Sequence, residues 1–138
     1  MFAEIFLGLL AGDYLSQSEA TAKRKSEKGW DGVRICTVHC LIVTICICLF
    51  IWSSTSFAVA FNPLLVALIF LTHWPIDRWS LGAKWLKLIH GRDIMRAFLS
   101  KEKYREIDLN FSCLVYKEVD NALHLILMWF IVGWLIGG

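Results

Sequence analysis

Charged residues are scarce in this chain, and their scarcity limits what kind of protein it is. Only 19% of the 138 residues are Asp, Glu, Lys or Arg, whereas 57% are hydrophobic and the mean hydropathy is +0.57. A soluble domain of this size has too much surface to be covered by so few polar groups. The composition therefore excludes an ordinary soluble domain and predicts an integral membrane protein.

Other common signals are also missing. None of the five cysteines forms a Cys-x-x-Cys pair, and four of them lie in one apolar run, so we expect packing residues rather than disulfides or a zinc knuckle. The first residues, Met-Phe-Ala-Glu-Ile-Phe-Leu, carry no positive charge and precede no small-residue cleavage site, so we expect them to be retained. No internal repeat is visible, and the length predicts one domain, residues 1–138.

Hydrophobic segments alternate with polar connectors along the chain. A bilayer-spanning helix needs roughly 17–25 residues, and only the first segment is short for that purpose. The sequence predicts an all-α polytopic membrane protein, a four-helix transmembrane bundle, although the first segment could instead be re-entrant. The expected spans are about 2–17, 33–52, 57–79 and 118–138. The long connector, residues 80–117, begins with an amphipathic interfacial helix over Lys84–Ile89 and continues as a solvated helix or loop.

The basic residues predict the orientation. All fourteen Lys and Arg fall in two stretches, five from Lys23 to Arg34 and nine from Arg78 to Lys117. In a four-span protein both stretches lie on one side, and the positive-inside rule places that side in the cytoplasm. We therefore expect a multi-pass membrane protein with both termini outside the cytoplasm. The lipid bilayer is the expected partner, a homo-oligomer is compatible with so small a bundle, and no nucleic-acid partner is expected.

Six ionisable residues share one predicted depth, within about two helical turns of the cytoplasmic boundary. They are Asp13, His39, His73, Asp77, Asp120 and His124. His73 and Asp77 are four residues apart and share a helix face, as do Asp120 and His124. Because the two pairs run in opposite order on antiparallel helices, we expect a deeper layer of imidazoles and a shallower layer of carboxylates.

This arrangement predicts a metal site. Zinc accepts both imidazole and carboxylate ligands, so the six residues suit one or two divalent ions, zinc foremost. Taken singly, each residue is better explained by an interfacial ion pair or a hydrogen bond, and only the six together favour a shared site. Lys28 and Arg34 lie near the same boundary and could bind a substrate phosphate, although contact with anionic lipid headgroups explains them as well.

Four stretches carry a resemblance to a known family. Gly12–Gln17, Val38–Thr44, Leu71–Trp79 and Val119–Leu125 together resemble small bacterial and phage inner-membrane proteins of unknown function. The His-x3-Asp helix is more distantly similar to membrane-bound metal-dependent hydrolases. The resemblance implies a membrane fold located in the bacterial inner membrane and a polar site, but no substrate. Members of the family often have a histidine one turn before the first Asp, where this chain has Leu9, which implies one ligand fewer here.

Three functions fit these features. The first is a metal-dependent hydrolase of a phosphorylated or amphiphilic substrate that enters from the cytoplasmic side, with the metal activating water. The second is a transporter or channel for a metal ion, a proton or a small solute, although the outer halves of the spans carry few polar groups besides Glu4 and Asn62. The third is a non-catalytic phage or bacterial membrane factor that binds a host partner. No catalytic residue is assigned from the sequence.

Overall fold

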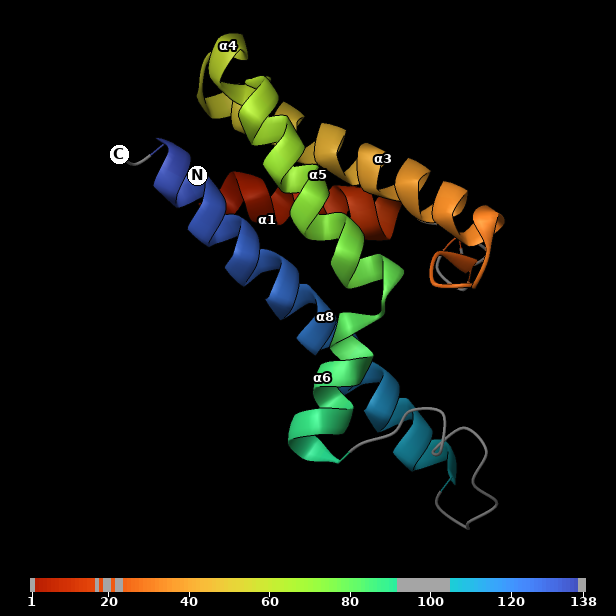
Figure 1. Ribbon diagram of the computed structural model, residues 1–138. Coiled ribbons are helices and arrows are strands. Elements are labelled where there is room, and N and C mark those ends of the chain that lie inside the picture. The colour runs from red at the N-terminus through yellow and green to blue at the C-terminus, as the bar shows by residue number, and fades with distance from the viewer. Residues whose placement is uncertain (1, 17, 19–20, 22–23, 92–104, 137–138) are drawn as a thin grey trace.

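The computed structural model describes residues 2–16, 18, 21, 24–91 and 105–136, and every regular element among them is helical (Figure 1). The predicted all-α class is therefore confirmed for the described part of the chain. The elements are α1 (Phe2–Leu10), the π-helical turn η1 (Ala11–Leu15), α3 (Trp30–Ser54), α4 (Phe57–Ala60), α5 (Pro63–Arg78), α6 (Leu81–His90) and α8 (Arg105–Ile136).

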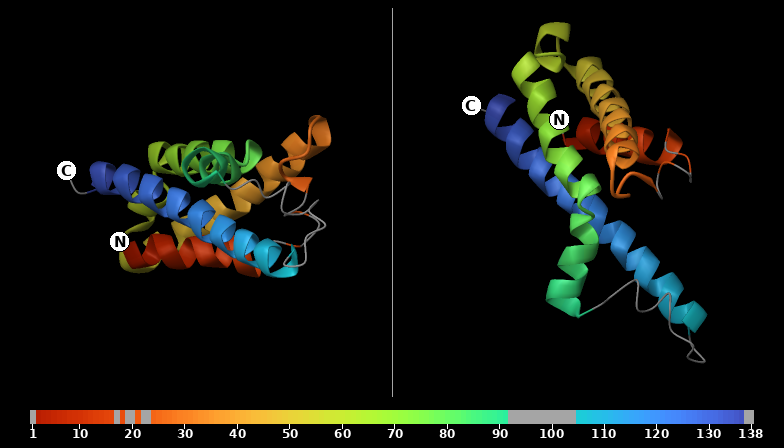
Figure 2. Two further views of the ribbon diagram at one scale, coloured as in Figure 1. Left: turned by 90° about the horizontal axis from the view of Figure 1, so that it is seen from below. Right: turned by 45° about the vertical axis from the view of Figure 1, so that its right-hand side comes forward.

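Four of these helices form a closed arrangement around an apolar core. Helix α1 contacts α3, α3 contacts α5, α5 contacts α8, and α8 contacts α1. Both ends of the described chain lie near α4 at one end of the molecule, whereas α6 and the first turns of α8 extend beyond the other end (Figures 1 and 2). The core between them is built from buried apolar side chains. They are Ile5, Leu9, Val43, Ile47, Cys48, Ile51, Ala60, Leu65, Ile69, Met128 and Val132.

Two glycines allow α1 and η1 to lie against α3. A Cβ atom on Gly8 would come within 2.5 Å of the Ile47 Cα atom, and one on Gly12 within 2.7 Å of the Val43 Cα atom. The two glycines are four residues apart and so share one helix face. Small residues at this spacing let two helix backbones approach closely. The contact of Gly12 brings the next residue, Asp13, next to the first half of α3.

Local signals explain where α5 begins and ends. The Asn62 side chain accepts hydrogen bonds from the backbone N–H groups of Leu64 and Leu65, and Pro63 occupies the first turn, where its missing N–H costs nothing. At the other end the chain leaves the helix at Trp79, and Ser80 adopts a left-handed conformation with φ of 47°. The chain then turns into α6, which packs along α8.

The predicted four spans are not confirmed. Among the described residues two helices are long and apolar enough to cross a membrane, Trp30–Ser54 and Asn110–Leu135. The 16 residues of α5 rise only about 24 Å, which is less than the roughly 30 Å of a hydrocarbon core. The two apolar helices suggest a membrane protein and leave the number of passes open.

The long connector, expected as an amphipathic helix followed by a solvated helix or loop, is partly helical in the described residues. Helix α8 begins at Arg105, well before the expected start of the last span near residue 118. Helix α6 packs beside α8. Leu86 of α6 and Ser112 of α8 are both buried. The expected interfacial helix Lys84–Ile89 does lie within a helix, α6. Residues 92–104 of the predicted connector lie outside the described residues.

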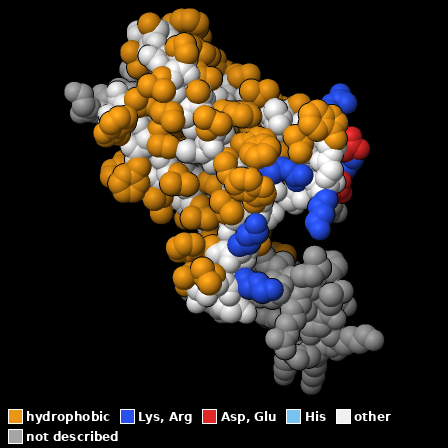
Figure 3. Space-filling view, viewed as in Figure 1, with side chains coloured by type: hydrophobic (Ala, Val, Ile, Leu, Met, Phe, Trp, Pro, Cys, Tyr) orange, Lys and Arg blue, Asp and Glu red, His pale blue; other side chains and the backbone are white. Residues whose placement is uncertain are grey.

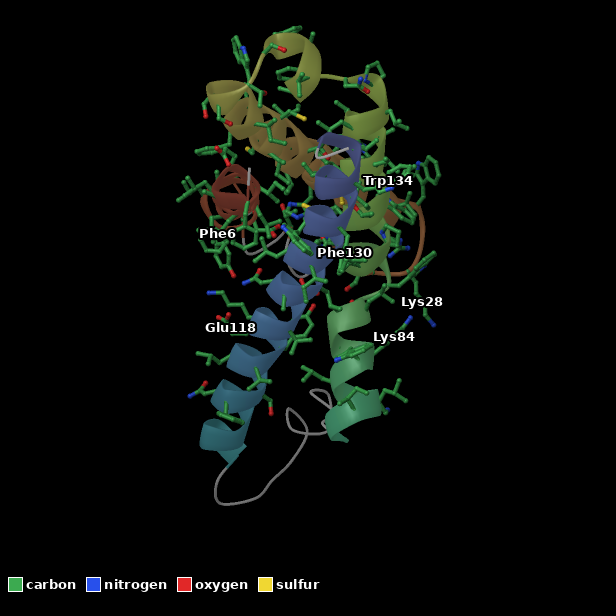
Figure 4. The ribbon with its side chains drawn as sticks, turned by 90° about the vertical axis from the view of Figure 1, so that its left-hand side faces the viewer. Phe6, Lys28, Lys84, Glu118, Phe130 and Trp134 are labelled. Carbon is green, nitrogen blue, oxygen red and sulfur yellow. The ribbon has the colours of Figure 1, made fainter. Side chains whose placement is uncertain are left out.

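Apolar side chains dominate the outer surface of the bundle. Only 17% of the apolar stretch of α8 and 44% of that of α3 are buried. Hydrophobic side chains cover the α4 end of the face in Figure 3, and the Lys and Arg side chains visible there lie toward the opposite end. In Figure 4, likewise, Phe6, Phe130 and Trp134 lie nearer the α4 end than Lys28, Lys84 and Glu118.

Candidate metal centre

The apolar core ends in a cluster of buried polar side chains. Several members of the cluster lie close to a core residue in the sequence. His39 is one helical turn from Val43 on α3, and His73 is one turn from Ile69 on α5. The structure brings together all six residues singled out by the sequence, in two ligand groups that share Asp77. Asp13 comes from η1, His39 from α3, His73 and Asp77 from α5, and Asp120 and His124 from α8.

Four of these residues converge on one point. The His39 Nε2 atom lies 3.0 Å from the Asp13 Oδ1 atom and 3.1 Å from the Asp77 Oδ2 atom. The His73 Nε2 atom lies 3.8 Å and 3.3 Å from the same two oxygens. Four ligands at 2.0–2.1 Å from a tetrahedral zinc ion are separated by about 3.3 Å. The four separations of 3.0–3.8 Å are therefore close to those around one zinc ion, and all four ligand atoms lie within 4.8 Å of one another.

A second, looser group shares one of these carboxylates. The ligand atoms of Asp77, Asp120 and His124 lie within 4.8 Å of one another, with the His124 Nε2 atom 3.8 Å from the Asp77 Oδ1 atom. The His124 Nδ1 atom lies 2.8 Å from the Asp120 carbonyl oxygen. A carbonyl only accepts, so Nδ1 carries the proton and Nε2 presents a lone pair toward the cluster. Asp77 thus offers Oδ2 to the first group and Oδ1 to the second.

Several polar atoms of the cluster have no hydrogen-bond partner among the described residues. Buried polar atoms are nearly always paired, and each unpaired one costs roughly 1–3 kcal/mol. A cation between the ligands would satisfy several of these atoms at once. Three of them, His73 Nδ1, Asp120 Oδ1 and His124 Nε2, lack a close partner within the described part of the chain, whereas Asp13 Oδ1, Asp77 Oδ2 and His73 Nε2 approach only one another and the His39 Nε2 atom.

The predicted separation into two layers is only partly right. The imidazoles do lie together, with ring centroids 4.1 Å apart for His73 and His124 and 5.6 Å apart for His39 and His73. The carboxylates do not form a separate layer, because both Asp13 and Asp77 reach the His39 Nε2 atom. Residue spacing gives the depth of each Cα atom but not the direction in which a side chain extends along its helix.

Lys25 is a member of the cluster that the sequence did not reveal. Its Nζ atom lies 2.7 Å from the Asp77 Oδ1 atom, and its side chain is 13% exposed. Burial alone would lower the pKa of Lys25, but the charge of Asp77 and the hydrogen bond to it raise this pKa above its ordinary value, so the side chain is an ammonium. Lys25 lies in a basic connector without helical periodicity, so no sequence pattern distinguishes it from its basic neighbours.

A cavity of about 400 Å³ opens beside His39. Arg34, one of the two predicted substrate-binding residues, lines it, whereas the other, Lys28, is exposed and does not. The sequence missed a second lining guanidinium, Arg24, whose Nε atom lies 3.4 Å from the Glu27 Oε2 atom. The remaining lining residues are Ser16, Thr21, Asp31, Ile35, Val38 and Ile42.

Leu9, one turn before Asp13, belongs to the apolar core and is 2% exposed. It takes no part in the polar cluster, so α1 contributes no ligand to the centre. Among the described residues before position 17, Asp13 of the π-helical turn supplies a ligand atom to it.

Comparison with known proteins identifies a family without a known activity. A family model described as a protein of unknown function (DUF3307) matches residues 1–136. No curated protein and no solved structure matches the chain.

Proposed function

We propose that this chain, which belongs to the DUF3307 family of proteins of unknown function, is a metal-dependent hydrolase of a phosphorylated or amphiphilic substrate. The observation that carries the proposal is the convergence of two imidazole and two carboxylate ligand atoms at 3.0–3.8 Å. Asp13, His39, His73 and Asp77 would hold a divalent ion, with zinc as the best match to the mixed ligand set. Asp120 and His124 lie beside it on α8.

The residues around the ion have distinct tasks in this proposal. When bound, a zinc ion polarises a phosphoryl or carbonyl oxygen and lowers the pKa of water toward about 7. The lone pair on the His124 Nε2 atom can accept the proton that the attacking water loses. The hydrogen bond from Nδ1 to the Asp120 carbonyl fixes the ring in the orientation and tautomer that this role needs.

The cavity beside His39 supports the substrate class. Arg24 and Arg34 place guanidinium groups on its wall, and guanidinium binds phosphate through paired hydrogen bonds. Ile35, Val38 and Ile42 give the same cavity an apolar side. Since His39 belongs to both the cavity and the ligand group, a phosphate bound there would lie next to the ion. An anionic headgroup with an attached acyl chain matches both walls.

The surface supports a membrane location. We place the protein in the bacterial inner membrane as a multi-pass protein, with α1, α5 and their neighbours in the bilayer and both termini outside the cytoplasm. The apolar surface of α8 and the clustering of basic residues at the end opposite α4 favour this orientation (Figures 3 and 4). The metal centre would then open toward the cytoplasmic leaflet, where a lipid substrate is accessible.

The other two functions are less well supported. A transport path would have to continue from the cluster to the α4 end, but the described residues there form an apolar core. A purely structural cluster would satisfy its own polar atoms, whereas several ligand atoms here lack a hydrogen-bond partner among the described residues.

The proposal is tested on the purified full-length chain in detergent. We expect one equivalent of metal in the wild-type protein and in a His90→Gln control, which changes the one histidine outside the cluster, and no metal in His73→Gln. Hydrolysis of a short-chain phosphatidic acid or of p-nitrophenyl esters should disappear on chelation and return with zinc. Absence of bound metal from every wild-type preparation would refute the proposal.

A further inference from the structure

The second ligand group poses a question that the proposed function leaves open. Asp77, Asp120 and His124 have the residue types of a metal site, and they share Asp77 with the first group, as a carboxylate bridging two ions would. A two-metal centre is therefore the obvious extension of the site. The Lys25 side chain argues against it.

We propose that Lys25 takes the place of a second metal ion and so keeps the centre mononuclear. The inference rests on the proposed metal site. The Lys25 Nζ atom lies 2.7 Å from the Asp77 Oδ1 atom, the oxygen that a second ion would need. The same oxygen lies 3.8 Å from the His124 Nε2 atom, so the ammonium group already binds the oxygen through which Asp77 would join the second group.

Charge balance favours one ion as well. The cluster holds three carboxylates, those of Asp13, Asp77 and Asp120, and the Lys25 ammonium. One divalent ion and this ammonium together neutralise the three negative charges. A second divalent ion beside Lys25 would leave two uncompensated positive charges among side chains that are largely buried, which is strongly unfavourable at low dielectric.

The two ligand groups also differ in quality. The first offers four ligand atoms with contacts of 3.0–3.8 Å, whereas the second offers three, and its His124 Nε2 atom lies 3.8 Å from the Asp77 Oδ1 atom. A single ion therefore belongs in the first group. Asp120 and His124 are left without a metal, and His124 stays available as the proton acceptor of the proposed reaction.

Metal stoichiometry tests the inference. The full-length protein in detergent is saturated with Zn²⁺, desalted and measured by inductively coupled plasma mass spectrometry. We expect one ion per chain in the wild type and in Lys25→Arg, which keeps the charge, and two in Lys25→Met, which removes it. Adding Asp120→Asn to Lys25→Met should return the count to one, because the second group then loses a ligand charge.

The possible outcomes separate the inference from the proposed function. Two ions in the wild type, or one in a folded Lys25→Met variant, would overturn the role of Lys25 while the metal site remains. No ion in the wild type would overturn both. If Lys25→Met does not fold, His124→Gln still decides, because it should keep one ion with unchanged zinc affinity. A tenfold weaker affinity in His124→Gln would show that His124 is a ligand and refute the inference.

Discussion

Replacing Gly12 by alanine should damage the metal centre without changing any ligand. A Cβ atom at this position would lie 2.7 Å from the Val43 Cα atom, and ordinary contact begins at 3.4 Å, so η1 would have to move away from α3 by about 0.7 Å. Metal sites tolerate ligand displacements of about 0.2 Å. Because Asp13 directly follows Gly12, the movement would lengthen the 3.0 Å separation between the Asp13 Oδ1 and His39 Nε2 atoms.

The expected loss is 10–100-fold in zinc affinity, the size seen when the support of a ligand is disturbed. Overpacking should also destabilise the fold by about 1–3 kcal/mol. Gly133→Ala is the matched control, because a Cβ atom there meets nothing within 4 Å. Affinity is measured by competition with a chromophoric chelator, and folding by thermal denaturation. A folded Gly12→Ala variant with the zinc affinity of the wild type would show that the close approach of η1 does not position Asp13.

Three further predictions concern other parts of the centre. Chelation should lower the melting temperature of the wild type but not of His73→Gln, since an ion at 100 times its Kd stabilises by about 2.7 kcal/mol; equal melting temperatures with and without chelator in the wild type would contradict this. In metal-free protein, the stability that Lys25 gains from Asp77 should be fully present below about pH 10.5 and lost as the pH rises through its raised pKa, so the difference between wild type and Lys25→Met should shrink only at strongly alkaline pH. Arg34→Gln should raise KM for a phosphate-bearing substrate several-fold with little change in kcat, and an unchanged KM would remove Arg34 from the substrate cavity.

The topology can be checked independently of the metal. A reporter fused to the C-terminus that is active only in the cytoplasm should be silent if both termini lie outside. A strong signal would reverse the proposed orientation and place the metal centre at the opposite face of the membrane.

The convergence of the six polar residues could be predicted because it depends on local, periodic features. A spacing of four residues places His73 and Asp77 on one face of their helix, and Asp120 and His124 on one face of theirs. Counting residues from the ends of the apolar segments gives the depth of each in the membrane. Whether they bind a metal stays a prediction. The sequence could also predict the amphipathic helix that became α6.

Other features depend on contacts that no local pattern encodes. The early start of α8 depends on packing against α6, and the approach of Lys25 to Asp77 joins residues 52 positions apart. The π-helical turn at Ala11–Leu15 has no signature in its composition. Four spans were expected because hydrophobicity was counted across residues 57–79 without a break. In the structure α4 ends at Ala60 and Asn62 caps a new helix, α5, whose 16 residues are short of a bilayer.

The apolar core behind the cluster has a kinetic consequence. With Ile47, Ile69 and Met128 filling the bundle on the α4 side, the described residues leave a molecule at the cluster no passage toward that end. For the proposed hydrolase, substrate and product would then share the side of the centre that Arg24 and Arg34 line. Inorganic phosphate should accordingly compete with a phosphate-bearing substrate.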